Sequence, residues 1–173
     1  MRGLVLAMGL AAAPVGAAVT QTGAADFTSE HRLTIAAPPA AVWRTLAEIG
    51  AWWDGAHSYS GSAANFSLAP KAGGCWCEVL PDGGSVEHMR VVYLAPGSML
   101  RMTGGLGPFQ GEPVTGVLTV TLKPAGTAGT ELTATFRAAG AFAGAGLAAM
   151  AQPVDGVLGQ QFARLKAAAE RPR

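Results

Sequence analysis

The sequence predicts an α+β domain, in which an antiparallel sheet of about seven strands curves around a long C-terminal helix, with two short helices after the first strand. Two observations support this fold class. A series of short β-prone segments lies between residues 65 and 138, and Gly or Pro closes each of them. An amphipathic stripe then follows in residues 153–170, and it needs the apolar face of the sheet as its partner.

The composition indicates one domain with a modest core. Of the 173 residues, 50% are hydrophobic and 13% are charged, and the net charge is +1. A chain of this length can bury a core of its own. Nucleic-acid binding requires a basic surface, which a chain so close to neutral does not offer, so we expect no nucleic acid as a partner.

Residues 1–25 have the pattern of a secretory signal peptide, because Arg2 precedes an apolar run that ends near Val15. The run is shorter than the ~20 residues of a membrane-spanning helix. We therefore expect a mature domain of residues 26–173, without a membrane span, that is periplasmic or secreted. Small residues offer cleavage points after Ala17, Ala18 or Ala25.

The first strand is predicted at residues 27–37, where His31, Leu33 and Ile35 alternate onto one side. Residues 38–50, PPAAVWRTLAEIG, predict a helix, since proline suits a first helical turn and the apolar residues fall on one face. A Trp-Trp turn and a polar loop follow. The later strands are predicted at residues 65–70, 75–80, 85–95, 98–103, 114–122 and 130–138.

In the last two strands the apolar residues share one parity, as expected for a sheet with one buried face. The C-terminal helix is predicted to start near Pro153, and Val154, Leu158, Phe162 and Leu165 form its apolar stripe. A curved sheet and a helix packed in this way leave a cavity between them, and a small molecule would bind there.

This order of elements resembles the START-like (SRPBCC, helix-grip) superfamily, and the chain is most similar to its bacterial polyketide cyclase/dehydrase-like branch. The resemblance covers roughly residues 27–170. It is carried by HRLTIAAPPAAVWRTLAEIGAWWDG, AGGCWCEVLPDGG, VVYLAPGSMLRMT, LTVTLKPAGTAGTELTATFR and the terminal helix. It implies an apolar ligand between sheet and helix but no single function, because the superfamily includes lipid carriers, hormone receptors, cyclases and oxygenase domains. The His-x-x-x-x-His iron pattern of the oxygenase members is not in the sequence.

Asp82–Gly83 predicts a two-residue turn, which pairs Cys77 with His88 and Cys75 with Arg90. A three-residue loop with a bulge would shift this register by one residue.

The two-residue turn also pairs Glu78 with Glu87. Two facing glutamates are tolerable only in water, so we expect them on the outer face. The cysteines, His88 and Arg90 then turn toward the helix.

The cysteines allow several interpretations. A disulfide is disfavoured, because in a regular strand their Cα atoms are about 6.5–7 Å apart. A metal site needs three or four ligands, which Cys75, Cys77, His88 and His57 could supply, although the spacing is not that of a zinc finger or ribbon. A thiol activated by His88 is another interpretation. We prefer small hydrophobic side chains in a cavity wall, with His88 as a polar point and no metal or cofactor.

Near the open end of the sheet, Trp53 would either stack on a ligand or plug the core, and His57 and Tyr59 would bind the ligand. Arg90 and Arg101 would bind an acidic ligand group if they point inward, since an unpaired buried guanidinium is costly. Otherwise they lie at the rim, paired with carboxylates.

We therefore expect an exported protein, monomeric or homodimeric, that binds a small apolar or aromatic molecule. One alternative is a cyclase-, dehydratase- or hydrolase-like enzyme that uses a cavity histidine as acid and base, without an assigned catalytic residue. Another is a partner-binding module with a filled core. The predicted ligand contacts are Trp53, His57, Tyr59, Cys75, Cys77, His88, Arg90, Arg101 and Phe162.

Overall fold

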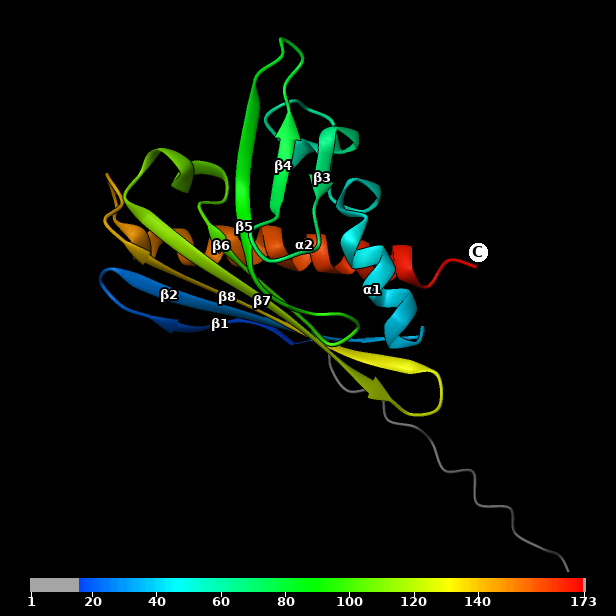
Figure 1. Cartoon of the computed structure of the whole chain (residues 1–173). Helices are drawn as coiled ribbons and strands as arrows, with labels where there is room; N and C mark the ends of the chain where they lie inside the picture. Colours follow the sequence, from blue (N-terminus) through cyan, green and yellow to red (C-terminus); the bar gives the residue numbers. More distant parts are fainter. Residues whose placement is uncertain (1–15, 173) are drawn as a thin grey trace, which may run out of the picture.

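The computed structural model describes residues 16–172 and has the predicted α+β, helix-grip architecture (Figure 1). An antiparallel sheet of eight strands, in the order β1-β2-β8-β7-β6-β5-β4-β3, curves around helix α2. The strands are β1 (Gly16–Thr22), β2 (Asp26–Ile35), β3 (Phe66–Leu68), β4 (Cys75–Val79), β5 (Ser85–Ala95), β6 (Met99–Gly104), β7 (Val114–Ala125) and β8 (Gly129–Gly140). The helices are α1 (Pro39–Ala47) and α2 (Ala151–Ala169), with 3-10 turns η1 (Ile49–Ala51), η2 (Gly55–His57), η3 (Ala63–Asn65), η4 (Gly107–Gly111) and η5 (Leu147–Met150).

Strand β1 is a strand of residues 16–172 that was not predicted. It lies within the segment predicted as a leader and pairs with β2, from Gly16 opposite Arg32 to Thr22 opposite Phe27. The apolar run of the predicted signal peptide, residues 1–15, lies outside the described residues. Cleavage after Ala25 would remove β1 from the sheet.

The helix α2 packs its apolar stripe across the inner face of the sheet, as its sequence pattern predicts. Leu158, Phe162 and Leu165 are buried there. Trp52 and Trp53, which follow α1 and η1, are also buried and pack against the same interior. Little space is left in the middle of the interior between the sheet and α2, since the void enclosed there measures about 10 Å³. A ligand site between the sheet and α2 must therefore lie toward one end.

The helix α1 starts at Pro39, in the first turn, where the missing N–H of proline has no consequence. It ends at Ala47, and the chain continues into η1 rather than as α-helix to the predicted Gly50. Gly50 lies so close to η3 that a Cβ there would be 2.8 Å from the carbonyl oxygen of Ala63. Within residues 16–172, no helix has both the length and the apolar character needed to cross a membrane.

Candidate functional site: a pocket beside the Glu78–His88 pair

The hairpin of β4 and β5 differs from the predicted register near its turn. Leu80 and Gly84 close the turn by a backbone hydrogen bond of 2.9 Å, which leaves three residues at the tip, with Gly83 at φ +85°. This is a three-residue loop whose last residue is left-handed, a conformation that glycine adopts readily. The predicted two-residue turn is therefore wrong, and Glu78 lies opposite Val86 instead of Glu87.

A β-bulge restores the predicted register further along the hairpin. Cys77 pairs with Glu87 and Trp76 pairs with Met89, so His88 is the extra residue of β5. Both His88 and Met89 are consequently buried, although they are adjacent in a strand. Beyond the bulge the next pair is as predicted, with Cys75 opposite Arg90.

Trp76 and Glu78 are the residues of β4 that point inward, and Cys75 and Cys77 occupy the outer face. Three predictions are corrected by this arrangement. The cysteines do not face the helix, Glu78 is not exposed, and Cys77 and His88 lie on opposite sides of the sheet. Arg90 is also outside and exposed, because the bulge changes the parity of β5.

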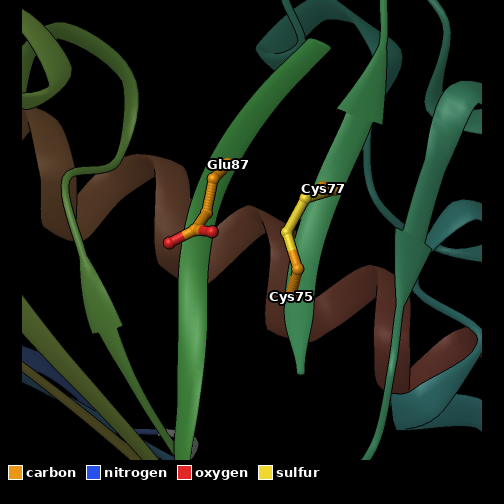
Figure 2. A group of neighbouring side chains, drawn as sticks. All are labelled: Cys75, Cys77 and Glu87. Atoms are coloured by element: carbon orange, nitrogen blue, oxygen red, sulfur yellow. A yellow bond between two sulfur atoms is a disulfide. The ribbon is translucent and has the colours of Figure 1, made fainter. Parts of the chain in front are cut away.

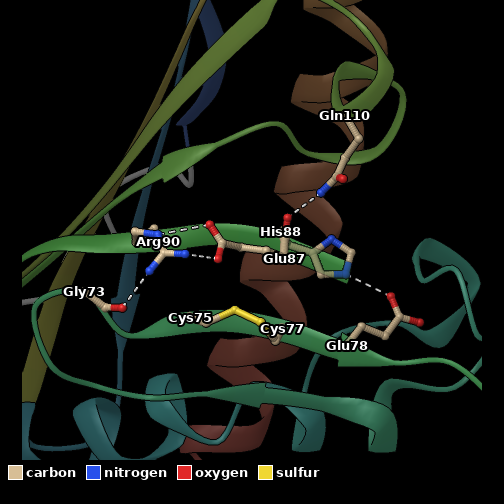
Figure 3. The surroundings of a disulfide bond; sticks show 8 residues. All are labelled: Gly73, Cys75, Cys77, Glu78, Glu87, His88, Arg90 and Gln110. Atoms are coloured by element: carbon tan, nitrogen blue, oxygen red, sulfur yellow. Dashed lines mark hydrogen bonds and ion pairs between the residues drawn. A yellow bond between two sulfur atoms is a disulfide. The ribbon is translucent and has the colours of Figure 1, made fainter. Parts of the chain in front are cut away.

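The cysteines form a disulfide, which the sequence analysis disfavoured (Figure 2). Their Cα atoms are 5.3 Å apart, closer than in a regular strand, and this distance lies within the range that disulfides span. Beside the bond, Arg90 binds Glu87 and donates to the carbonyl oxygen of Gly73 at 3.0 Å (Figure 3). The sulfur atoms and a Glu87 oxygen lie within 4.8 Å of one another, but sulfurs joined to each other are not thiolate ligands for a metal.

Removing the disulfide is expected to lower stability modestly, because the loop that it closes is so short. Cys75→Ser/Cys77→Ser should lose about 1.5 kcal/mol of unfolding free energy, measured by urea denaturation. Reductant should lower the urea midpoint of the wild-type protein and leave the midpoint of the double variant unchanged. A wild-type midpoint that is insensitive to reductant would contradict the assignment of the bond.

On the inner face, the buried carboxylate of Glu78 is the centre of a polar cluster. It accepts hydrogen bonds from the backbone N–H groups of Tyr59, at 3.1 Å, and Ser60, at 2.5 Å. A further partner is Nε2 of His88, at 2.8 Å (Figure 3). Glu78 therefore fixes both the loop after η2 and the orientation of the imidazole.

The electrostatics of this pair favour a carboxylate and a neutral imidazole. Burial alone raises the pKa of Glu78, but hydrogen bonds from Ser60, Tyr59 and His88 outweigh it and lower the pKa. Burial lowers the pKa of His88, although Glu78 opposes this shift. We therefore assign the proton to Nε2, which donates to Glu78, and leave Nδ1 as an acceptor. Figure 3 shows the second ring nitrogen pointing away from Glu78.

A second buried histidine fixes α2 to the sheet. Nε2 of His31 lies 2.9 Å from the hydroxyl of Ser29, and that hydroxyl donates to Asp155 of α2 at 2.6 Å. Burial lowers the pKa of His31, with a smaller opposing effect from the charge of Asp155. The cluster lies under the N-terminal half of α2 and holds that half of the helix on β2.

The two buried histidines predict a loss of stability in mild acid. Their folded pKa values lie below the ordinary value of 6.5, so the unfolded chain binds more protons as the pH falls through 6.5. The unfolding free energy should thus be highest above pH 6.5 and decline toward pH 5. Urea midpoints across this range test the prediction. His31→Gln and His88→Gln should each flatten the slope, and exchange of the exposed His57 is the control.

A pocket of about 450 Å³ opens between the β4–β5 end of the sheet and the N-terminal half of α2. Its wall is mainly apolar and includes Trp53, Trp76, Met150, Val154, Val157 and Leu158. The side chains with polar atoms on the wall, apart from the indoles, are His57, Ser58, Tyr59 and His88. The hydroxyl of Tyr59 donates to the carbonyl oxygen of Gly107 at 2.9 Å, which joins two of the segments that line the pocket.

Of the predicted contact residues, Trp53, His57, Tyr59 and His88 line this pocket. Trp53 is also part of the core, as one of its two interpretations expects, and its stacking on a ligand stays a prediction. The others lie elsewhere: Cys75, Cys77 and Arg90 on the outer face, Arg101 in contact with Thr119 and Tyr93, and Phe162 inside the core.

Trp76 and Glu78 were not predicted as inward-facing residues. A signal for them was available, because the pair of Trp76 and Met89 is far more apolar than the pair of Cys75 and Arg90. Choosing the inner face by its bulkiest side chains would have oriented β4 correctly.

A profile of the protein family described as "Polyketide cyclase / dehydrase and lipid transport" matches residues 26–170. The chain belongs to this family. The match runs from the start of β2 through α2, so it includes every element that lines the pocket. None of the curated proteins matches the chain.

Solved structures have the fold of this polyketide cyclase/dehydrase family member at low sequence identity. A conserved protein of unknown function from Enterococcus faecalis is 17% identical, with a TM-score of 0.62 over 90% of this chain and 78% of its own. The Mll3558 protein from Rhizobium loti is 21% identical, with a TM-score of 0.62 over 83% and 96%. The MLL2253 protein from Mesorhizobium loti is 21% identical, with a TM-score of 0.56 over 84% and 98%. These likenesses establish the fold alone.

Proposed function

We propose that this protein is an exported member of the family that binds a small apolar or aromatic molecule in the pocket between the sheet and α2. The observation that carries the proposal is the pocket itself, since its volume and apolar wall are those of sites for small molecules. Membership of a family named for polyketide chemistry and lipid transport supports the same class of ligand.

Two features support export. The N-terminal segment has the pattern of a signal peptide. The disulfide of Cys75 and Cys77 suits an oxidising compartment, where such bonds persist. Of the candidate cleavage points, those after Ala17 and Ala18 would leave most of β1 on the mature chain.

Native mass spectrometry of the protein purified from its own host tests both export and ligand binding. We expect a bound organic molecule, a disulfide and a chain that begins near Val19. An unprocessed N-terminus would overturn export, and a chain that carries no ligand and also binds no neutral apolar probe would overturn ligand binding. The same measurement reports the oligomeric state.

Filling the pocket is expected to abolish binding without unfolding the protein. Val157 is half-buried on the pocket wall, so Val157→Trp should weaken binding of the neutral dye N-phenyl-1-naphthylamine by roughly 100-fold, the equivalent of about 3 kcal/mol of lost apolar burial. Gln160→Trp, on the exposed side of the same helix, is the matched control and should bind the dye normally. Equal dye affinities for Val157→Trp and Gln160→Trp would mean that the dye binds outside the pocket.

A second candidate function, proton transfer on the bound molecule, is favoured by the Glu78–His88 pair. A histidine held in one orientation by a buried carboxylate is the arrangement in which imidazole acts as a general base. In this case His88→Ala would remove turnover and leave ligand affinity nearly unchanged. If His88→Ala instead lowers ligand affinity as much as turnover, His88 binds the ligand and does not transfer a proton.

A further inference from the structure

The side-chain polar atoms that the pocket presents to a ligand are mainly hydrogen-bond acceptors. His88 commits Nε2 to Glu78, at 2.8 Å, and its Nδ1 makes no hydrogen bond with the residues that the structure describes. A neutral imidazole that donates through Nε2 accepts through Nδ1. His88 is 4% exposed and lies on the pocket wall, and its Nδ1 is not a fully buried atom, so a molecule in the pocket can reach this acceptor.

The two hydroxyl groups on the wall have used their protons in the same way. Tyr59 donates to the carbonyl oxygen of Gly107 at 2.9 Å, and Ser58 donates to that of Gly55 at 2.7 Å. Each hydroxyl oxygen can therefore only accept from a ligand. His57 is exposed at the rim and can either donate or accept.

One donor on the wall also lacks a partner, but a ligand cannot reach it directly. Nε1 of Trp76 makes no hydrogen bond within residues 16–172, and the atom itself is buried. Trp53, the other indole of the wall, donates Nε1 to the carbonyl oxygen of His57 at 3.1 Å. Neither indole offers a free donor to a molecule that enters the pocket.

The charges around the pocket disfavour an anion. No lysine or arginine is among the described lining residues, and the carboxylate of Glu78 lies directly behind the lining residue His88. Arg90 and Arg101, which would have bound an acidic group, lie on the outer face. A ligand carboxylate would thus lose its hydration without gaining a cation, and this is unfavourable in an apolar pocket.

We propose that the pocket selects a neutral apolar molecule that carries a hydroxyl group, and that this hydroxyl donates its hydrogen bond to Nδ1 of His88. The inference rests on the proposed function, because it names the chemistry of the ligand in the same pocket. Glu78 is the positioning residue, since it holds the imidazole in the tautomer that accepts.

A series of three probes of nearly equal size tests the proposal on the full mature chain at pH 7.5. They are 2-naphthol, 2-methoxynaphthalene and 2-naphthoate, with affinities measured by calorimetry or by displacement of N-phenyl-1-naphthylamine. We expect 2-naphthol to bind about tenfold more tightly than 2-methoxynaphthalene, which lacks the donor. The anion 2-naphthoate should bind more weakly than either neutral probe.

Variants assign the effect to residues. His88→Phe keeps an aromatic ring but removes the acceptor, so the tenfold preference for 2-naphthol should vanish while 2-methoxynaphthalene keeps its affinity. Glu78→Gln keeps a hydrogen-bonding group but removes the charge, and it should tighten binding of 2-naphthoate. Thermal melts verify that each variant is folded. If His88→Phe does not fold, the comparison of the three probes on the wild-type protein still tests the proposal.

The outcomes separate the two proposals. Equal affinities for the three probes, or tightest binding of 2-naphthoate, would overturn the inference and leave the ligand-binding function intact. If no neutral probe binds, or if binding is unaffected by Val157→Trp, the proposed function itself fails.

Discussion

Replacing Glu78 by alanine is expected to destabilise the protein by about 3 kcal/mol, measured as the free energy of unfolding in urea. The carboxylate is fully buried and is the shared acceptor for two backbone N–H groups and for His88. Without it, these donors lose their partner in the protein interior, and buried donors without partners are costly. The loop of Tyr59 and Ser60 should also lose its attachment to β4.

Glu87→Ala is the matched control, because Glu87 lies in the partner strand but on the outer face, where its side chain is 43% exposed. An exposed ion pair contributes little, so we expect a loss below about 1 kcal/mol. The comparison also tests the strand register directly. Nearly equal losses for the two variants would indicate the regular hairpin, in which both glutamates face water.

Replacing Phe162 by alanine is expected to cost about 4 kcal/mol of unfolding free energy, since the change leaves a cavity in a packed interior. The ring is 1% exposed and lies against Trp52, at a centroid distance of 6.4 Å, and His31, at 5.8 Å. It lines only the residual void of the core and not the pocket. The affinity of the folded fraction for a neutral dye should therefore change little.

Val154→Ala, on the same helix, is expected to affect dye binding more than stability. Val154 is half-buried on the pocket wall, so we expect a loss of about 1 kcal/mol or less in stability and a several-fold weaker dye affinity. Should Phe162→Ala instead spare stability and weaken dye binding, the ring would belong to the ligand site after all.

The elements could be predicted from the sequence because each one repeats its pattern over several residues. The stripe of Leu158, Phe162 and Leu165 fixed the face of α2, and the alternation of His31, Leu33 and Ile35 fixed that of β2. Both were found as predicted, since a slip by one residue would have exposed a whole row of apolar side chains.

The pocket was harder to predict, because a single loop residue decides the orientation of a strand. The choice of a three-residue turn over a two-residue turn moved Glu78 from the outer face to the inner one. The bulge at His88 then compensated for that shift, and no periodic pattern marks a bulge of one residue. The disulfide was not predicted because regular strand spacing places Cys75 and Cys77 farther apart than the 5.3 Å found between their Cα atoms.

The hydrogen bond from Tyr59 to Gly107 has a kinetic consequence. It ties together two segments that line the pocket, and we expect a molecule that fills the interior to enter or leave only when this hydrogen bond opens. The observed association rate should then level off at high ligand concentration, at the rate at which this hydrogen bond opens. The residence time of the ligand should be longer than its affinity alone suggests.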